Sequence, residues 1–128
     1  MSARPTGAPA PIVVLSDLIF GARIRAAAAA RGIPVTLSLV PERIVEAVRD
    51  GARAVFIDLD NRATDPVAVI ARIRADPASG DAPIVAFASH VRTDLIEAAR
   101  VAGASRVLAR GAFARLLPSL LLDSGADG

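Results

Sequence analysis

The chain has 128 residues, 53% of them hydrophobic, with 15 basic and 13 acidic residues and a formal net charge of +2. Every basic residue is arginine, and cysteine, tryptophan and tyrosine are absent, which excludes lysine Schiff bases, P-loop lysines, thiolate zinc sites and thiol nucleophiles. A chain of this length forms one domain without disulfides or a structural metal. Because the net charge is small and arginine is interleaved with acidic residues, we expect no nucleic-acid partner.

The two ends of the chain differ in composition from the middle. Residues 1–10 are small and proline-rich, and residues 123–128 are polar and glycine-rich, so we predict disordered tails around one domain at residues 11–122. No apolar run approaches the roughly 20 residues that span a bilayer, and no secretory signal pattern opens the chain. We therefore expect a cytoplasmic protein that does not bind a membrane.

The first half of the domain alternates apolar runs with helical patterns. In chain order these predict a strand, a helix, a strand and a helix at residues 12–15, 18–31, 35–40 and 41–50. The first run is β-branched and does not alternate, as in a strand covered on both faces, whereas the second alternates and suits a strand near the sheet edge. Gly32 and Gly51 follow the helical patterns, and Pro41 suits a first helical position.

The second half repeats the pattern three times. The sequence predicts strands at residues 54–59, 83–88 and 106–109, each followed by a helix. The first of these helices opens with Asp65 as N-cap and Pro66 in the first turn, and Val67, Ile70 and Ile73 form its buried stripe. The next helix covers residues 93–102. The last is lined by apolar residues spaced by three and four: Phe113, Leu116, Leu117, Leu120 and Leu121.

Five strand–helix units predict an α/β fold, a doubly wound parallel sheet of five strands with five helices on its two faces. In such sheets the functional residues lie where the strands end at their carboxyl edge. The candidates at that edge are Ser16, Asp17, residues 58–60, residues 88–90 and Arg110.

Three segments resemble the receiver domain of bacterial two-component response regulators. They are AVFIDLD in the third strand, PIVAFASH in the fourth, and AGASRVLARGAF around the fifth. The resemblance covers nearly all of residues 11–122. It implies the flavodoxin-like receiver topology and a role in two-component signal transduction, including phosphorelays, in a bacterial cell.

The resemblance also implies a phosphorylation site that uses Mg²⁺. Asp58 matches the aspartate that accepts the phosphoryl group, and the ion would neutralise charge on the transferred oxygens. The family's acidic pair after the first strand is Ser16 and Asp17 here, so one carboxylate is missing. Asp60 lies where the family uses a backbone carbonyl, and its side chain is a candidate replacement. The sequence thus predicts a weak Mg²⁺ site at Asp17, Asp58 and Asp60.

The end of the fourth strand departs from the family pattern. The family has a hydroxyl there that closes on the phosphoryl group, but this chain has Ala88, whose methyl group donates no hydrogen bond. Ser89 follows, and because side chains alternate along a strand, its hydroxyl would reach the site only after a slip of one residue. His90, the only histidine, lies in the loop over the site and is a further candidate binding residue.

The fifth strand departs as well. Arg110 takes the position of the family's lysine, Gly111 that of the following proline, and Val107 that of an aromatic residue that turns inward on activation. A guanidinium is shaped for pairing with a carboxylate, so we expect Arg110 to form a standing ion pair with Asp58 or Asp17. Asp17 is also a candidate N-cap. A tight ion pair at Arg110 would indicate a pseudo-receiver that does not switch. An open acidic pocket would indicate a receiver that can still be phosphorylated.

Three functions remain open from the sequence. The first is a receiver-like signalling module with a degenerate phosphorylation site, which is not an enzyme and binds a protein partner or a second copy through the face formed by residues 93–102, residues 106–109 and the last helix. The second is an atypical response regulator that uses Mg²⁺ and transfers a phosphoryl group from a phosphodonor to its own Asp58. The third is a flavodoxin-like binder of a small molecule, although residues 16–21 lack the small residues of a phosphate-binding loop.

Overall fold

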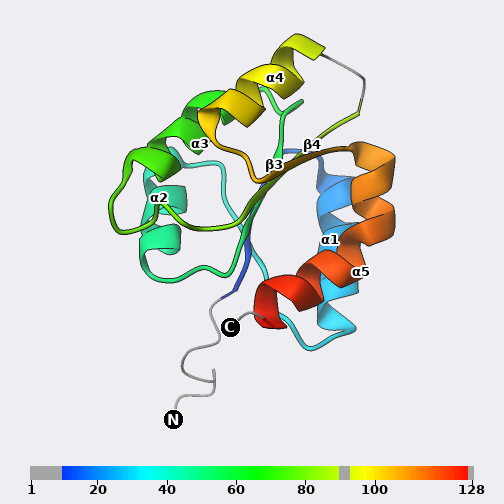
Figure 1. Cartoon of the computed structure of the whole chain (residues 1–128). Helices are drawn as coiled ribbons and strands as arrows, with labels where there is room; N and C mark the ends of the chain where they lie inside the picture. Colours follow the sequence, from blue (N-terminus) through cyan, green and yellow to red (C-terminus); the bar gives the residue numbers. More distant parts are fainter. Residues whose placement is uncertain (1–9, 90–92, 127–128) are drawn as a thin grey trace.

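The computed structural model describes residues 10–89 and 93–126, in which five strands alternate with five helices (Figure 1). The strands are β1 (Ile12–Val14), β2 (Thr36–Leu37), β3 (Val55–Asp58), β4 (Ile84–Ala88) and β5 (Arg106–Ala109). The helices are α1 (Leu18–Ala29), α2 (Pro41–Arg49), α3 (Pro66–Ala75), α4 (Thr93–Ala102) and α5 (Arg110–Ala126). The predicted α/β fold class is confirmed.

The five strands form one parallel sheet in the order β2-β1-β3-β4-β5. The short β2 lies at an edge, as its alternating sequence predicts. The chain order reverses between β1 and β3, which is the place where doubly wound sheets open a crevice. In register, Asp58 pairs with Phe87, and Ala88 pairs with Ala109. The carboxyl ends of β3, β4 and β5 therefore meet at one edge of the sheet.

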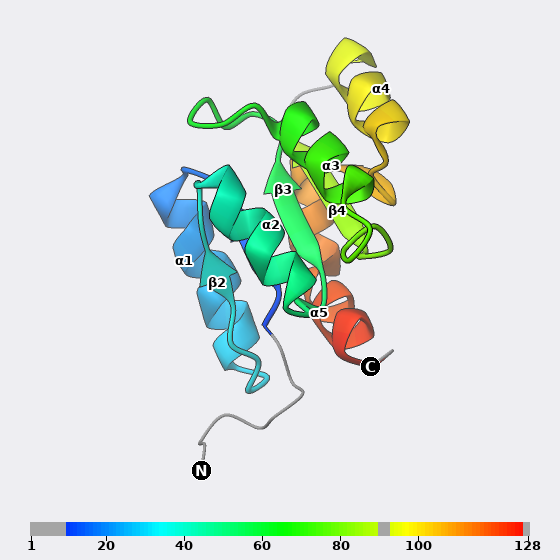
Figure 2. The ribbon, with the colours of Figure 1, turned by 90° about the vertical axis from the view of Figure 1, so that its left-hand side faces the viewer.

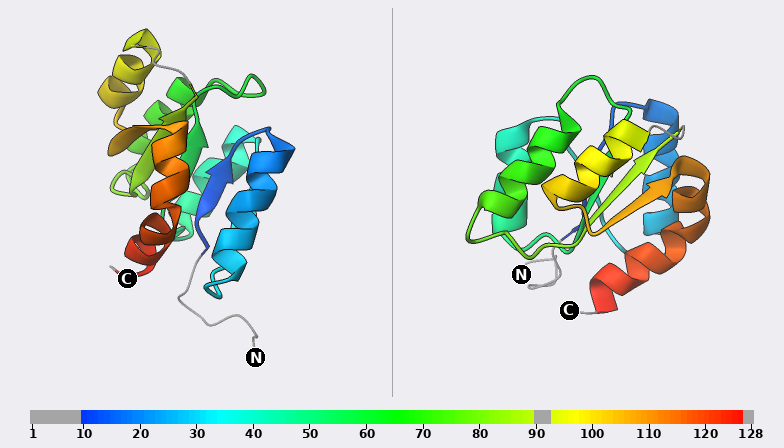
Figure 3. Two further views of the ribbon diagram at one scale, coloured as in Figure 1. Left: turned by 90° about the vertical axis from the view of Figure 1, so that its right-hand side faces the viewer. Right: turned by 45° about the horizontal axis from the view of Figure 1, so that its top comes forward.

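Two layers of helices cover the sheet. Helices α1 and α5 pack against each other on one face (Figures 1 and 3), and α2, α3 and α4 cover the other (Figures 1 and 2). The core under α1 and α5 holds all four phenylalanines, which are buried. Phe113 stacks on Phe87 with ring centroids 4.2 Å apart, and Phe20 lies edge-on to Phe87 at 5.6 Å. These rings fix the starts of α1 and α5 against β4.

The helix ends follow the predicted signals. The carboxylate of Asp17 accepts the Phe20 N–H at 2.9 Å, and that of Asp65 accepts the Ala68 N–H at 3.2 Å. Pro41 is the first residue of α2. The residues that follow α1, α2 and α4 include a glycine with positive φ in each case, as expected for left-handed helix ends.

Two details of the predicted elements are corrected. In α3 the buried side chains include Val69, whereas Val67 is half-buried, because the helix opens with Pro66 turned toward the core. Helix α5 continues to Ala126, past the predicted domain end at residue 122, because the polar residues there are compatible with a last helical turn as well as with a tail. Of the tail expected at residues 1–10, residues 1–9 lie outside the described residues. Within the described part of the chain, no helix is long and apolar enough to cross a membrane.

Candidate functional site

Three predicted site residues converge at the carboxyl edge of the sheet. Asp17 precedes α1, Asp58 is the last residue of β3, and Arg110 is the first residue of α5. One nitrogen of the Arg110 guanidinium lies 2.5 Å from an Asp17 oxygen, and another lies 3.9 Å from Asp58 Oδ2. The arginine thus lies between two carboxylates, and the predicted ion pair is confirmed.

Asp58 is almost fully enclosed, with 3% of its surface exposed. Its Oδ1 accepts the Asp60 N–H at 2.8 Å, while its backbone carbonyl accepts the Asn61 side-chain amide at 2.8 Å. Burial raises the pKa of the Asp58 carboxyl, because it penalises the ionised form more than the Asp60 N–H and Arg110 stabilise it. Ionised Asp58 therefore destabilises the folded state, and the neighbouring guanidinium of Arg110 offsets this destabilisation only in part.

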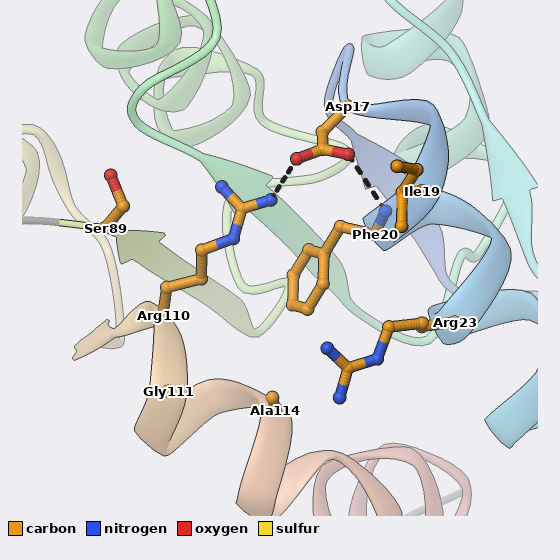
Figure 4. Close-up of a pocket in the computed structure, with 8 residues that line it drawn as sticks. All are labelled: Asp17, Ile19, Phe20, Arg23, Ser89, Arg110, Gly111 and Ala114. Carbon is orange, nitrogen blue, oxygen red and sulfur yellow. Dashed lines mark hydrogen bonds and ion pairs between the residues drawn. The ribbon is translucent and has the colours of Figure 1, made fainter.

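Asp17 has both carboxylate oxygens engaged. Oδ1 accepts the Phe20 N–H that caps α1, and Oδ2 accepts from Arg110 (Figure 4). The Phe20 N–H bond and the nearby Arg110 charge hold the pKa of Asp17 below its usual value. The Arg110 guanidinium also lies 4.3 Å from the centre of the Phe20 ring, a cation–π distance. Asp17 and Phe20 thus hold Arg110 from two sides.

Asp60 and Ser89 form a second polar contact, between the loops after β3 and β4. Asp60 Oδ2 accepts the Ser89 N–H at 2.5 Å and the Ser89 hydroxyl at 2.7 Å. Asp60 is thus turned toward Ser89, and its part in a metal site with Asp17 and Asp58 stays a prediction. Ser89 lines the same pocket as Arg110 without any slip in register, because it lies just past the end of β4, where strand alternation no longer fixes its direction.

The other predicted switch positions lie around this centre. Ala88 is buried at the end of β4, and Val107 is half-buried against the core under α2, α3 and α4. Ser16 is exposed after β1. Gly111 is exposed in the first turn of α5, where a Cβ atom would meet no described atom within 4 Å. His90 lies outside the described residues.

A pocket of about 510 Å³ opens beside the Asp17–Arg110 pair, between the starts of α1 and α5. Figure 4 shows the Phe20 side chain between Arg110 and Arg23, whose guanidinium lies 5.8 Å from the centre of the ring. The pocket is lined by Asp17, Ile19, Phe20, Arg23, Ser89, Arg110, Gly111 and Ala114. The roles of Phe20 and Arg23 were not predicted from the sequence, because α1 has apolar residues on its inner and outer faces.

Many solved structures have the same architecture. The receiver domain of a sensor histidine kinase from Pseudomonas aeruginosa, with a magnesium ion in its active-site cleft, is 21% identical, with 93% of this chain and 99% of that one covered and a TM-score of 0.74. A response regulator from Thermotoga maritima is 19% identical, with 91% and 98% covered and a TM-score of 0.69. A CheY-like receiver domain from Methylobacillus flagellatus is 20% identical, with 89% and 96% covered and a TM-score of 0.69.

The chain has the receiver-domain fold. The resemblance seen in the sequence is thereby confirmed at the level of the fold. No family model matches the sequence, and no curated protein is significantly similar to it. The details of the site must therefore be judged from this chain's own residues.

The acidic residues of this receiver fold do not fit a magnesium ion as they stand. Both oxygens of Asp17 are engaged, Asp60 is turned to Ser89, and the Arg110 guanidinium lies between Asp17 and Asp58. Among the described residues, no three acidic or histidine side chains are grouped closely enough to hold a metal. A guanidinium beside the two carboxylates also repels a divalent cation.

The buried charge of Asp58 gives a first prediction. We expect Asp58→Asn to raise the free energy of unfolding by about 1 kcal/mol at pH 7, since the amide removes a desolvated charge and keeps the shape of the side chain. The folded-state pKa of Asp58 is raised, so the stability that this residue contributes falls as the pH rises above the ordinary value of 3.8. The gain should therefore be small in acid and grow toward neutral pH.

Urea unfolding from pH 3 to pH 8 measures this difference. Asp17 and Asp76 have lowered pKa values, so the stability that they contribute is lost in acid. This loss occurs in both proteins and cancels in the difference between their free energies of unfolding. Asp65→Asn, at an exposed cap that keeps a capping side chain, is the matched control for the same chemical change outside the buried site. A destabilised Asp58→Asn protein at neutral pH would contradict the prediction.

Proposed function

We propose that this receiver fold is a signalling module with a degenerate phosphorylation site, a pseudo-receiver that acts by binding other proteins in two-component-type signal transduction. The observation that carries the proposal is the Arg110 bridge between Asp17 and Asp58. A receiver that receives no phosphoryl group retains its surfaces, so binding is the activity left to it.

The chemistry of the site supports an inactive acceptor. Phosphoryl transfer to a carboxylate requires a free attacking oxygen and cations or hydrogen-bond donors around the transferred oxygens. Here Asp58 Oδ1 is held by the Asp60 N–H, and Oδ2 faces Arg110. Ala88 supplies no hydroxyl at the end of β4, and the Ser89 hydroxyl is bound to Asp60.

The face formed by α4, β5 and α5 is the surface that we propose for a protein partner or for a second copy in a homodimer. β5 is an edge strand of the sheet, and Arg106 on it is exposed. Val101 on α4 is 77% exposed, which is high for a large apolar side chain. An exposed apolar residue, an exposed arginine and a strand edge on neighbouring elements are features that protein interfaces favour.

The alternative is an atypical response regulator phosphorylated on Asp58 with Mg²⁺. Its support is the position of Asp58 at the end of β3, where, among the described residues, the one polar contact of Oδ2 is the longer ion pair to Arg110. The two functions differ in whether Arg110 leaves Asp58 when a phosphoryl group and a cation compete for it. A small-molecule binder of flavodoxin type has no phosphate-binding loop to support it.

The deciding experiment is a titration with Mg²⁺ and beryllofluoride, a mimic of the phosphoryl group, followed by amide NMR. We expect no shifts at Asp58, Ala88 or Ser89 at millimolar concentrations, and no gain of phosphate mass after incubation with acetyl phosphate. A receiver domain with a complete magnesium site serves as the positive control. Shifts centred on Asp58 together with a phosphorylated mass would overturn the degenerate-site proposal in favour of the alternative.

A further inference from the structure

The two edges of the sheet differ in the charge that they carry. β2 forms one edge and β5 forms the other. β5 begins with the exposed Arg106 and is followed directly by Arg110, and charged side chains on an edge strand are a common protection against pairing with a further strand. Residues 32–41, which contain β2, include no charged residue, although 22% of the chain is charged. The edge at β2 therefore lacks this protection.

The backbone of β2 has hydrogen-bonding groups on its outer side. The N–H groups of Thr36 and Ser38 donate to backbone carbonyls beside or within β1, at 3.0 and 3.1 Å. Successive residues of a strand turn their N–H and C=O groups to opposite sides, so those of Val35 and Leu37 point away from β1. Within the described residues no strand lies on that side, and Figure 2 shows β2 at the front of the molecule between α1 and α2.

The same edge has an exposed apolar side chain at one end and a pocket at the other. Val40, shortly after β2, is 45% exposed. A pocket of about 390 Å³ opens at the start of β2, where it is lined by residues 32–35 and by Arg25 and Ala29 of α1. Most of this lining is apolar. The exposed valine and the pocket are thus separated by the length of β2.

We propose that a second copy of this chain pairs with the β2 edge, antiparallel, with Leu37 of one copy opposite Leu37 of the other. A two-fold axis makes both copies contribute the same residues. In this register Val35 lies opposite Leu39 of the second copy, so the outward-facing backbone groups pair. Pro34 lies opposite Val40 of the second copy, at a position whose N–H would face β1, so the proline removes no bond between the copies.

The side chains agree with this register. Val40 of each copy lies beside the pocket at the start of β2 in the other copy, where Ile33 and Val35 bury its apolar surface. Thr36 lies opposite Ser38 of the second copy, and such hydroxyl pairs stabilise neighbouring antiparallel strands. Each contact forms twice because of the two-fold axis. The edge is therefore complementary to itself.

Other occupants of the β2 edge have less support. Residues 1–9 of the same chain include Pro5 and Pro9, which donate no N–H to a strand. A charged partner has no charge to recognise in residues 32–41. An uncharged strand of another protein would satisfy the backbone groups, but only a second copy supplies the exposed Val40 at the position of the pocket.

Cysteine substitutions test the register, since the chain contains no cysteine. Thr36→Cys is placed in one copy and Ser38→Cys in the other. The proposed register sets these two residues in a non-hydrogen-bonded pair with Cα atoms about 4.5 Å apart, which suits a disulfide. Oxidation of the equimolar mixture should give roughly threefold or more cross-linked dimer than either variant alone, because identical cysteines are then only diagonal neighbours, about 7 Å apart.

Sedimentation of the full chain at increasing concentration measures the dimer itself. Val40→Arg should weaken the dimer roughly tenfold or more, because it sets a guanidinium against the apolar pocket and Arg25 of the second copy. Val101→Arg makes the same change at an exposed valine of α4 and should alter the dissociation constant less than about twofold. The melting temperature of each variant at low concentration verifies that it is folded.

Amide hydrogen exchange gives a second measure of the same contact. The Leu37 N–H should exchange rapidly at about 10 μM protein and more slowly as the concentration rises toward about 1 mM. The Thr36 N–H is the internal control, because its bond toward β1 protects it at every concentration.

Four results would overturn the proposal. The first two are a chain that stays monomeric at about 1 mM and equal cross-linking of the mixture and the single variants. The third is a larger loss in Val101→Arg than in Val40→Arg, which would assign the second copy to the face of α4, β5 and α5. The fourth is protection of the Leu37 N–H that does not depend on concentration, which would show that the same chain covers the edge.

The β2 edge lies across the sheet from the face of α4, β5 and α5, and it leaves that face to a different protein. The dimer also makes no use of Asp58 or of a cation. The beryllofluoride titration and the dimer measurements can therefore fail separately.

Discussion

Replacement of Arg74 by alanine is expected to lower the free energy of unfolding by about 3 kcal/mol, because it removes a charged group with several partly buried hydrogen bonds and leaves their acceptors without donors. Arg74 lies at the end of α3 and donates to three backbone carbonyls, those of Gly103 at 2.8 Å, Gly80 at 2.9 Å and Ala82 at 2.5 Å. It also contacts the Ser105 hydroxyl at 3.1 Å. One side chain thus joins α3 to the connection before β4 and to the turn before β5.

Gly103 offers a second way to break the same contact. A Cβ atom there would lie 2.5 Å from Arg74 Cγ, and the backbone φ of +120° is unfavourable for any other residue. Gly103→Ala should therefore cost more than Gly32→Ala, where φ is also positive but a Cβ would meet no described atom within 4 Å. Because backbone strain is itself larger at φ +120° than at φ +68°, the double variant with Arg74→Ala is needed to isolate the loss of the Arg74 contact.

Urea unfolding of the single and double variants measures the coupling. Since Gly103→Ala already displaces Arg74, the double variant should lose clearly less stability than the two single losses added together. Full additivity, or equal costs for the two glycine substitutions, would contradict the role assigned to Arg74.

Replacement of Arg110 by alanine is expected to change the site more than any other single substitution. Asp17 and Asp58 would then face each other without the guanidinium that now separates their charges. Their mutual repulsion should raise the pKa of Asp58 further, and a divalent cation should relieve it. We therefore expect Arg110→Ala to bind Mg²⁺ at millimolar concentrations at which we expect the parent chain not to bind it.

Amide shifts of Asp17 and Asp58 during a Mg²⁺ titration measure this gain. Arg115→Ala removes an exposed arginine from the same helix and is the control for a general change in charge. Equal Mg²⁺ responses of the parent chain and the Arg110 variant would show that the guanidinium does not govern cation access.

The order of elements was predictable from the sequence because hydrophobic periodicity and helix-end signals are local. The bounds of α4 and β5 agree with their predicted ranges, and the caps at Asp17 and Asp65 were visible as patterns. The end of α5 was less predictable, because the polar residues after Leu122 are compatible with a tail as well as with a last helical turn.

The site was predictable to the extent that strand ends define it. Asp17, Asp58 and Arg110 were placed together because each lies at the carboxyl edge of a parallel sheet. The Asp60–Ser89 contact was not predicted, since it depends on how two loops close over the strand ends. The Arg74 contacts were missed for a similar reason, because residues 74 and 103 are far apart in the sequence and no local pattern links them.

The junction between β5 and α5 bears on how firmly the central ion pair is held. β5 ends at Ala109 and α5 begins at Arg110, with no connecting residue between them. A side chain on a loop must give up backbone freedom before it can hold a partner, whereas the backbone of Arg110 is already fixed by the strand before it and the helix after it. Much of the entropy cost of the contact with Asp17 is thus met when the domain folds. The folding of the sheet edge itself therefore supports the pair, and only the side chain of Arg110 has still to be ordered.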